Sequence, residues 1–415
     1  MPSILIVTVA YPPSRLIGGR RPVRMAAGLE ARGWDVTVAT LHGRYMQPLD
    51  PAPTADGTVT VLRSHALMPR VWLARQAAAA TADRPAGTRQ EAAAWRAGLG
   101  RWLRRVEFPD EYAGWLPLAL LQLRGRRFDV VLATLPPPTV ACIGAAVARR
   151  GQSRLVLDYR DPWCEVMTRD GSYGLDKAYG AGELALHRAL EDRLLRRAEL
   201  VLAVTPKMRD WLAPRAPCPV RFLANGLDAP PPLPPLPRAR PLRLVYAGSL
   251  AYERSLDSVL GAIAALADEF PPSALRLAYA GPHGAALRQA AERLGVAAWL
   301  DDRGMLPHAE VLALYRGAAA GVVAVSARTD YSYPGKLFEI LTAGCPILLC
   351  GPDDSEAARL VRELDVGGVD SGASPTASIE ALRRVLAAPP PSRDLSAWYA
   401  DAQMQRLNDE LRRLL

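Results

Sequence analysis

The sequence lacks long apolar runs and has almost no lysine. No stretch of about 18 or more apolar residues occurs in the chain, which argues against a transmembrane helix. The opening MPSILIVTVAYPP has no basic segment ahead of its apolar one and alternates like a strand, so it does not indicate a signal peptide. Of the 51 lysines and arginines only three are lysines, and Lys336 is one of them.

Cysteine and histidine are scarce, and neither forms a recognisable ligand pattern. Five cysteines and five histidines are scattered along the chain, without a CxxC pair or a metal-type cluster. This usage is typical of reduced thiols in a cytoplasmic protein, and it predicts that no metal is bound. The chain also has neither GxGxxG nor a GxxxxGK followed by Ser or Thr, which disfavours a classical dinucleotide oxidoreductase and a Walker-type ATPase.

Positive charge is concentrated in one stretch, residues 69–127. The chain has a formal net charge of +9, and this stretch holds eleven arginines against five acidic residues, together with Trp72, Trp95, Trp102 and Trp115. Arginine with tryptophan suits an anionic membrane surface, an anionic substrate or nucleic acid. Nucleic acid is the weakest of the three, because no helix-turn-helix, zinc-finger or ribonucleoprotein signature is present. Ordinary helices with tryptophan inward and arginine outward would explain the stretch equally well.

Strand and helix patterns alternate along most of the chain. Apolar runs of the buried-strand type occur at 4–10, 35–41, 129–135, 154–159 and 199–205, and again at 242–248, 275–281, 320–327 and 346–351. Helical periodicity lies between them at 21–33, 182–198, 256–266 and 285–295. The order strand–helix–strand predicts right-handed parallel crossovers and therefore parallel-sheet α/β domains.

A proline tract at 228–241 separates the two series of strands. Its sequence, DAPPPLPPLPRARP, is typical of a semi-rigid extended linker. We therefore predict an N-terminal domain at 1–227, with a basic helical insert at about 69–127, and a C-terminal domain at 242–395. An amphipathic helix within 396–415 is expected to pack back on the N-terminal domain. Ligands of such folds bind beyond the carboxyl ends of the strands and in interdomain clefts.

Two loops of the N-terminal domain carry candidate binding residues. Gly18 and Gly19 precede a helix, where small residues let backbone amides approach an anion, although a plain flexible turn explains them equally well. Asp158, Arg160 and Asp161 lie where the strand at 154–159 ends, in the motif LDYRDPWCE. Charges that end a buried strand indicate a functional edge, and the alternative is an Asp–Arg pair that holds the turn.

The C-terminal domain opens with a strand, a glycine turn and a helix. Gly248 and Ser249 lie at the end of the strand, and Arg254 lies at the start of the helix. Backbone amides with an arginine beside them predict an anion site. An exposed helix-start arginine is the alternative, although a cation is mildly unfavourable at that end of a helix.

The helix that begins in YSYPGKLFE carries two charges that need an explanation. Pro334 and Gly335 mark its start. Lys336 lies in the first turn, where it opposes the helix dipole, and Glu339 lies on the same face. A phosphate at Lys336, with Glu339 accepting from sugar hydroxyls, would explain both charges. A surface Lys–Glu pair would explain them too, but such a pair contributes only ~0.3 kcal/mol.

The motifs taken together resemble a known family from end to end. The chain resembles the retaining GT-B glycosyltransferases of the large family four. DYRDPW (158–163) and PGKLFE with the following AGCP carry most of the resemblance, supported by the Gly18–Gly19 loop, ALEDRLLRRAELVLAVT, ANGLD, YAGSL and RGMLPHAEVLALYRGA. It implies two Rossmann-like parallel-sheet domains that face each other across a cleft.

The resemblance assigns roles to several candidate residues. Glu339 would hold the ribose hydroxyls of a nucleotide-sugar, and the Pro334–Lys336 turn would lie against this donor. Arg254 would contact the diphosphate, with Lys336 and the Gly19 amide as further contacts. These groups would stabilise the leaving diphosphate electrostatically, and no enzyme nucleophile is implied.

The same resemblance places the base and the sugar, and it reveals two departures from the family. Backbone around Gly304 and Met305 would meet the base, and Asp161 would lie near the transferred sugar, where many relatives keep a histidine. The family often has two glutamates separated by seven residues. Tyr331 stands at the earlier position, so the sequence leaves the sugar unspecified. Ser249 stands where an arginine is common, which leaves fewer cations for the diphosphate.

The function that the resemblance implies is transfer of a sugar from a nucleotide-sugar to a hydroxyl acceptor, with retention of configuration. The acceptor would be a glycan, a lipid-linked or a natural-product intermediate, and neither a metal nor a nucleic-acid partner is expected. A nucleotide-sugar epimerase of the same fold and a non-catalytic partner subunit are the alternatives. The predicted location is the cytoplasm. The insert at 69–127 either contacts the anionic inner face of the membrane or shapes a pocket for a soluble acceptor.

Overall fold

The computed structural model describes most of the chain. The described residues are 1–14, 16–45, 58–68, 107–170, 180–227, 240–250, 254–389 and 394–415. Most of the predicted basic insert (69–106) and most of the predicted linker (228–239) lie outside these residues. Within the described part of the chain, no helix is long and apolar enough to cross a membrane.

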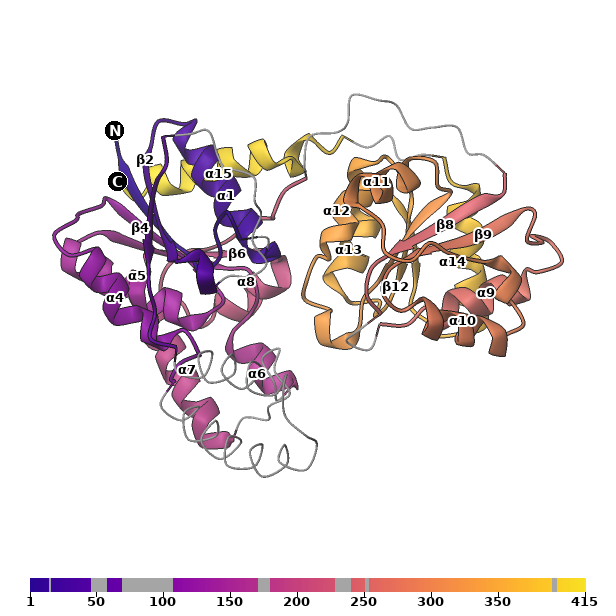
Figure 1. Ribbon diagram of the computed structural model, residues 1–415, viewed down its shortest axis with the longest axis horizontal. Coiled ribbons are helices and arrows are strands. Elements are labelled where there is room, and N and C mark those ends of the chain that lie inside the picture. The colour runs from indigo at the N-terminus through magenta and orange to yellow at the C-terminus, as the bar shows by residue number, and fades with distance from the viewer. Residues whose placement is uncertain are drawn as a thin grey trace, which may run out of the picture. The chain divides into compact units, whose positions relative to one another are not determined.

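Contacts divide the chain into two units, which we call the N-terminal unit and the C-terminal unit (Figure 1). The N-terminal unit comprises Met1–Val204, Met208–Leu223 and Met404–Leu415. The C-terminal unit comprises Thr205–Lys207 and Ala224–Gln403. The C-terminal unit therefore takes in seven residues, 205–207 and 224–227, that the predicted boundary at 227 assigns to the N-terminal domain.

The N-terminal unit is built on a seven-stranded parallel sheet of order β3-β2-β1-β4-β5-β6-β7. Its strands are β1 (Ser3–Val7), β2 (Asp35–Leu41), β3 (Thr60–Ser64), β4 (Val130–Leu135), β5 (Arg154–Tyr159), β6 (Leu200–Ala203) and β7 (Val220–Phe222). The central strand β4 is buried along its whole length. Its continuous apolar run, VVLATL, is what a parallel strand covered on both faces requires.

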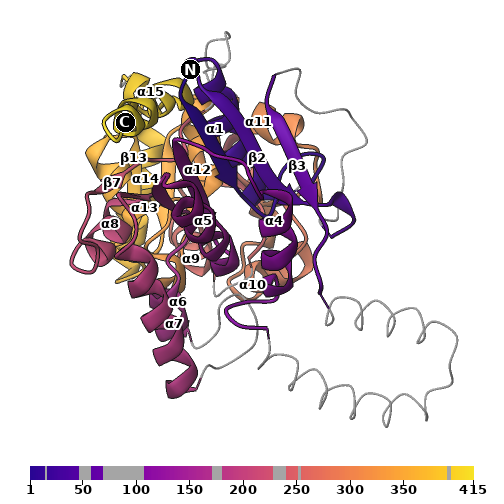
Figure 2. The same ribbon diagram turned by 90° about the vertical axis from the view of Figure 1, so that its left-hand side faces the viewer.

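Helices connect these strands. They are α1 (Arg20–Glu30), α4 (Leu116–Gln122), α5 (Pro138–Gly151), α6 (Cys164–Asp170), α7 (Ala181–Leu195) and α8 (Pro206–Leu212), with short 3₁₀ turns η1 (Ile17–Gly19), η2 (Gly43–Tyr45) and η3 (Ala113–Trp115). The last helix, α15 (Ala400–Arg412), runs beside α1 (Figure 2). The indole of Trp34 donates to Asn408 at 3.0 Å, and Met404 packs so closely on Gly28 that a Cβ there would lie 2.5 Å from its Cγ.

The C-terminal unit is built on a six-stranded parallel sheet of order β10-β9-β8-β11-β12-β13. Its strands are β8 (Leu242–Ala247), β9 (Leu275–Ala280), β10 (Leu300–Asp302), β11 (Ala320–Ala324), β12 (Ile347–Cys350) and β13 (Gly367–Asp370). Its helices are α9 (Asp257–Ala265), α10 (Gly284–Arg293), α11 (His308–Arg316), α12 (Gly335–Thr342), α13 (Glu356–Glu363) and α14 (Pro375–Ala387), with 3₁₀ turns η4 (Ala297–Trp299), η5 (Ala327–Thr329) and η6 (Ser396–Trp398). Alternate residues of β8 enter two separate apolar clusters, because successive side chains of a strand point to opposite faces.

The predicted fold class, two parallel-sheet α/β units, is confirmed. All nine predicted strands are present, with ends shifted by a few residues. Four short strands were missed, namely β3, β7, β10 and β13. Each of them is a strand of three to five residues, and β10 (LDD) is largely polar. Such strands are held by pairing with a neighbour rather than by a pattern of their own.

Candidate active site

The glycine loop of the N-terminal unit is held by the guanidinium of Arg160. This side chain donates to the carbonyls of Gly18, Leu135 and Pro136, so it joins the loop before α1 to the end of β4. A Cβ on Gly18 would lie 2.5 Å from Nη1 of Arg160, and a Cβ on Gly19 would lie 3.3 Å from the Ala10 carbonyl oxygen. The two glycines are therefore required by close packing at the carboxyl edge of the sheet.

Asp158 is paired with an arginine that the sequence analysis did not single out. Its carboxylate is fully buried and accepts from Nε and Nη2 of Arg21, with the shortest distance 2.7 Å, and from the Thr134 hydroxyl at 2.8 Å. Arg21 lies in the first turn of α1. The predicted alternative, an Asp–Arg pair that holds the turn, is what the structure shows for Asp158, with Arg21 rather than Arg160 as the partner.

Asp161 lies in the same loop but has no hydrogen bond to any residue that the structure describes. Burial raises the pKa of its carboxyl group, and the neighbouring Arg160 opposes this shift. Two residues later, the indole of Trp163 donates to Nδ1 of His187 at 3.2 Å, which anchors the loop on α7. The loop therefore presents a carboxyl group with a raised pKa from a backbone that is anchored on α7.

The glycine turn of the C-terminal unit is fixed by two tyrosines. The Tyr279 hydroxyl donates to the Gly248 carbonyl at 3.0 Å, and the Tyr246 hydroxyl donates to the Ser249 carbonyl at 2.8 Å. Gly248 has φ = +137°, a conformation that residues with a Cβ rarely adopt. Sequence analysis missed these tyrosines, although the triplet YAG ends both β8 and β9 and could have indicated a shared role.

Lys336 extends from the first turn of α12 to the glycine turn. A Cβ on Gly248 would lie 1.3 Å from Nζ of Lys336, so the ammonium group occupies the space that any larger residue would fill. Nζ also lies 5.4 Å from the centre of the Tyr246 ring. Burial, followed by the charge of Arg254, lowers the pKa of Lys336 to about 8, while Glu339 acts in the opposite direction. Nε of Arg254 is buried and has no hydrogen-bond partner among the described residues.

Lys336 and Glu339 do not form the surface pair that the sequence left open. No ion pair joins them in the described part of the chain. The Glu339 carboxylate instead lies 3.9 Å from Nδ1 of His308, at the start of α11. The ammonium and the carboxylate therefore point to different neighbours and can contact different parts of one ligand.

The loop at Gly304 and Met305 follows β10. Gly304 has φ = +63°, its amide donates to Oδ1 of Asp302 at 3.1 Å, and its carbonyl accepts from the Gly281 amide at 2.8 Å. The Met305 side chain is 74% exposed. The loop backbone is thus fixed while its one long apolar side chain faces solvent.

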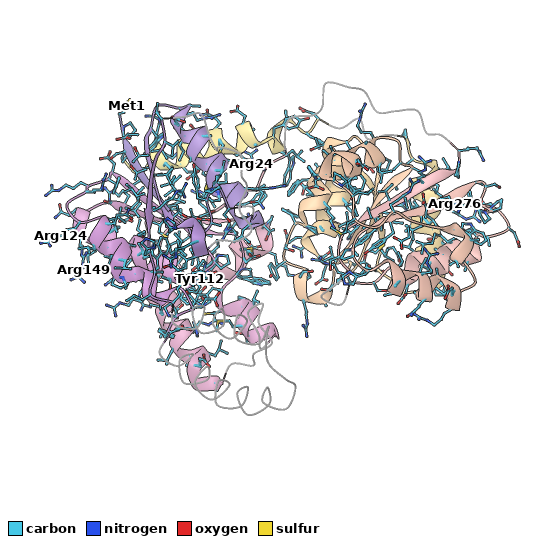
Figure 3. The ribbon with its side chains drawn as sticks, viewed as in Figure 1. Met1, Arg24, Tyr112, Arg124, Arg149 and Arg276 are labelled. Atoms are coloured by element: carbon cyan, nitrogen blue, oxygen red, sulfur yellow. The ribbon has the colours of Figure 1, made fainter. Side chains whose placement is uncertain are left out.

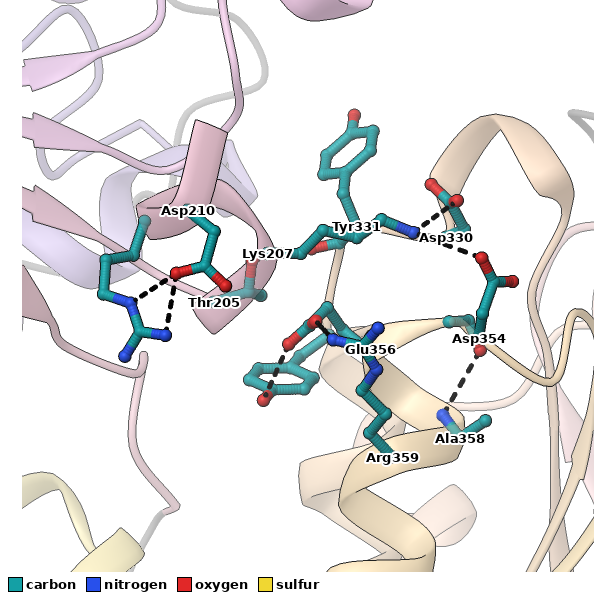
Figure 4. Close-up of polar contacts among 12 residues, drawn as sticks. Thr205, Lys207, Asp210, Asp330, Tyr331, Asp354, Glu356, Ala358 and Arg359 are labelled. Atoms are coloured by element: carbon teal, nitrogen blue, oxygen red, sulfur yellow. Dashed lines mark hydrogen bonds and ion pairs between the residues drawn. The ribbon is translucent and has the colours of Figure 1, made fainter. Parts of the chain in front are cut away.

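The loop that leads into α12 is tied to the residues at the start of α8 (Figure 4). The Thr205 hydroxyl donates to the Tyr331 carbonyl at 2.8 Å, and Nζ of Lys207 lies 2.8 Å from Asp330 and 3.7 Å from Asp354. Tyr331 is buried, and Pro334 is the N-cap of α12 with Gly335 as the first helical residue. Lys207 and its two aspartates were missed, because residues far apart in the sequence give no local signal.

The described residues contain no group of three or more His, Cys, Asp and Glu side chains that could hold a metal ion. All five cysteines lie in the described part of the chain and are free thiols. The C-terminal unit offers Lys336 and Arg254, which form no ion pair with a described residue, and the carboxylate of Glu339. The N-terminal unit offers the carboxyl group of Asp161.

Comparison with known proteins identifies the family. The model of the glycosyl transferase 4-like domain matches residues 18–226. The chain belongs to this family. The predicted enzyme class, a glycosyltransferase, is confirmed by this match. No curated protein matches the sequence.

Solved structures show that this family member has the GT-B fold that the resemblance implies. Sucrose-phosphate synthase from Thermosynechococcus elongatus is 14% identical with a TM-score of 0.65, covering 100% of this chain and 99% of the other. An α,α-trehalose-phosphate synthase (UDP-forming) from Burkholderia vietnamiensis is 14% identical with a TM-score of 0.62 and the same coverage. The lipopolysaccharide outer core galactosyltransferase WaaB is 11% identical with a TM-score of 0.59, covering 100% of both chains. The predicted GT-B fold class is confirmed.

Proposed function

We propose that this glycosyltransferase moves a sugar from a nucleotide-diphosphate donor to a hydroxyl acceptor with retention of configuration. The observation that carries the proposal is the pair of cations at the glycine turn. Lys336 and Arg254 approach each other closely enough for the charge of Arg254 to lower the pKa of Lys336, and neither forms an ion pair with a described residue. Two neighbouring cations repel each other, so a doubly charged diphosphate between them and the backbone amides would relieve a real electrostatic cost.

The remaining donor contacts follow from the positions around these cations. The Glu339 carboxylate, which forms no ion pair with Lys336, is proposed to accept hydrogen bonds from the two ribose hydroxyls. The Gly304 backbone and the exposed Met305 are proposed to meet the base. Tyr331 and the Pro334–Gly335 turn are proposed to lie against the sugar end of the donor. Gly248 and Ser249 are proposed to line the diphosphate as a fixed turn, since both of their carbonyls accept from tyrosine hydroxyls and the Gly248 amide donates to the Ala280 carbonyl at 2.7 Å.

The chemistry needs no enzyme nucleophile. The bond between the sugar anomeric carbon and the diphosphate oxygen breaks, and the acceptor oxygen bonds to the same face of the sugar. The acceptor proton passes to the departing diphosphate, whose charge Lys336 and Arg254 stabilise. In the N-terminal unit, the Gly18–Gly19 loop and Asp161 are proposed to contact the acceptor and the sugar, with Arg160 and Asp158 fixing the backbone around them. The cytoplasm is the proposed compartment, in keeping with five free thiols.

A screen with UDP-, GDP- and dTDP-sugars tests the proposal directly. We expect one nucleotide class to raise the unfolding temperature of the intact protein. The variant Glu339→Ala should weaken that binding by about ten- to a hundredfold, because it loses charge-assisted hydrogen bonds worth about 1.5–3 kcal/mol. Glu380→Ala, at an exposed glutamate of α14, is the matched control and should bind like the parent. Failure of every nucleotide-sugar to stabilise the protein would exclude the proposed function, and equal binding by the two variants would exclude the assigned site.

Donor binding should depend on pH through Lys336. The free protein loses the Lys336 proton as the pH rises through about 8, whereas the bound diphosphate favours the charged form. The dissociation constant of the nucleotide-sugar should therefore be flat below this pH and should rise up to about tenfold for each pH unit above it. Calorimetric titrations of the parent and of Lys336→Met measure this dissociation constant. They run from about pH 6 to about pH 9.5, which spans the lowered pKa of Lys336 and approaches the ordinary pKa of a lysine. Lys336→Met should bind weakly at every pH, without the bend. A bend that persists in this variant would assign the proton to another group.

A further inference from the structure

Exposed arginines gather at the amino edge of the N-terminal sheet. Three neighbouring strands, β4, β5 and β6, are each entered through an arginine-rich segment: LRGRRFD, ARRGQSR and LRRAE. We call their eight exposed arginines the arginine rim: Arg124, Arg126, Arg127, Arg149, Arg150, Arg154, Arg196 and Arg197. Figure 3 shows Arg124 and Arg149 next to each other at the margin of this unit.

The strand pairing brings the three segments together. The Arg154 amide donates to the Asp129 carbonyl at 2.9 Å, and the Glu199 amide donates to the Leu155 carbonyl at 2.9 Å. The segments thus enter the sheet side by side, one strand spacing apart, which is about 4.8 Å. The rim is therefore one continuous surface rather than three separate sites.

Two acidic groups beside the rim bind neutral donors rather than rim arginines. Asp129 accepts from the amide and the hydroxyl of Ser3 at 2.7 and 2.9 Å, and Glu199 accepts from the Leu155 amide at 2.7 Å. Among the described residues, no rim arginine forms an ion pair. The rim is thus a concentration of like charges that repel one another, and such a surface is stabilised when it meets negative charge.

Local structure alone does not explain the rim. Cations in the last turn of a helix are favourable, which accounts for Arg149 and Arg150 at the end of α5. It does not account for Arg126 or Arg127, which follow α4 by several residues, or for Arg154 in β5.

We propose that the arginine rim docks on an anionic lipid surface. Binding to headgroup phosphates requires only positive charge at the protein surface, and each arginine near the lipid contributes to the binding free energy. The described rim segments carry no exposed aromatic residue that could stack on bases, which disfavours single-stranded nucleic acid. They also lack the apolar centre of a protein interface, apart from Leu121 of α4, whose exposed fraction is 65%. Leu415, whose exposed fraction is 58%, lines a pocket together with Arg127 and Arg154. Exposed leucines beside arginines suit shallow insertion among headgroups.

The rim lies at the opposite edge of the sheet from the Gly18–Gly19 loop and Arg160. Docking through the rim therefore leaves the carboxyl edge free, so lipid binding and donor binding should not compete. The proposal does not involve Trp72, Trp95 or Trp102 of the predicted insert. It does not depend on the proposed sugar transfer, and it applies to the intact chain whatever the donor is.

The test is vesicle sedimentation with the full-length protein. Vesicles of phosphatidylcholine alone are compared with vesicles of equal parts phosphatidylcholine and phosphatidylglycerol, at low and at physiological ionic strength. We expect binding to the anionic vesicles, weakened by salt, and a loss of at least about tenfold in the variant R126E/R149E. The matched control is R293E/R384E, which places the same charge change at exposed arginines of α10 and α14 and should bind like the parent.

Four results would overturn the proposal. The parent protein could fail to bind anionic vesicles, or the two variants could lose binding equally, which would mean that only net charge matters. Binding that is as strong to neutral vesicles would point to apolar insertion instead. Loss of single-stranded RNA binding in R126E/R149E with unchanged vesicle binding would assign the rim to nucleic acid. Unfolding temperatures of all three proteins, measured alongside, establish that the charge-reversed variants are folded.

Discussion

Gly248→Ala is expected to remove nearly all donor binding while leaving the protein folded. A Cβ at this position would lie 1.3 Å from Nζ of Lys336, so the ammonium group must leave its place beside the turn. The flexible lysine side chain can move away, and for this reason the main loss falls on the site rather than on the fold. The φ of +137° adds backbone strain of about 1–3 kcal/mol, which should lower the unfolding temperature modestly.

The expected size of the effect follows from the charges involved. Displacing Lys336 removes one of the two cations proposed to hold the diphosphate, and the distorted turn shifts Gly248 and Ser249, which are proposed to line it. Charge-assisted hydrogen bonds contribute about 1.5–3 kcal/mol each, so two lost contacts correspond to at least a hundredfold weaker binding. Isothermal titration with the nucleotide-sugar found in the screen measures this change.

A second glycine provides the control. Gly261 lies within α9, and nothing lies within 4 Å of a Cβ built on it. Gly261→Ala should bind the donor normally and gain about 0.5–1 kcal/mol of stability, as a helical glycine replaced by alanine does. A double variant, Gly248→Ala with Lys336→Ala, separates the two causes. If it binds no more weakly than Lys336→Ala alone, Gly248 acts through the lysine; an additive loss would show that the turn backbone acts on its own.

The pattern of apolar runs was enough to predict the architecture. Buried parallel strands such as β4 and β8 have continuous apolar sequences, and helical periodicity between them leaves few other topologies. The short edge strands had no such pattern. For β10, two of three residues are aspartates, and the strand exists because β9 offers it a ladder of hydrogen bonds. Strand pairing of this kind depends on a neighbouring strand in the folded protein, and the local sequence does not predict it.

Candidate site residues could be predicted where a local motif carried them. The short stretches that contain Gly248, Lys336 and Glu339 also contain charged residues that an ordinary helix start or strand end would not favour. These unfavourable charges could be recognised in the sequence. The partners that define their roles were not visible. Neither the ring of Tyr246 beside Lys336 nor the His308 imidazole near Glu339 could be inferred, since both contacts join segments that only the folded sheet brings together.

Asp158 illustrates the same limit in the other unit. This residue was predicted either to bind substrate or to pair with an arginine that holds the turn, and the structure shows a buried arginine as its partner. Arg21 precedes Asp158 by 137 residues, so nothing local connects them. The side chains of Arg21 and Asp158 are 4% and 0% exposed, which makes this pair one of the least solvated in the described chain.

Arg21→Met is therefore expected to destabilise the N-terminal unit by about 3–5 kcal/mol. Among the described residues, the substitution leaves the buried Asp158 carboxylate with only the Thr134 hydroxyl as a donor, and an unpaired buried charge is costly. Calorimetric unfolding of the intact chain measures the loss as a lower transition temperature. Arg20→Met is the matched control, because Arg20 is the preceding residue of α1 and is exposed. It should change stability by no more than about 0.5 kcal/mol.

The double variant Arg21→Met with Asp158→Asn decides whether the cost comes from the unpaired charge. Removing the carboxylate charge together with the arginine leaves a neutral amide, which the Thr134 hydroxyl can still bond. Most of the stability lost in Arg21→Met should then return, because a buried pair replaced as a whole is often nearly neutral. If the double variant is as unstable as Arg21→Met, the loss comes from the packing of the arginine stem against the start of α1.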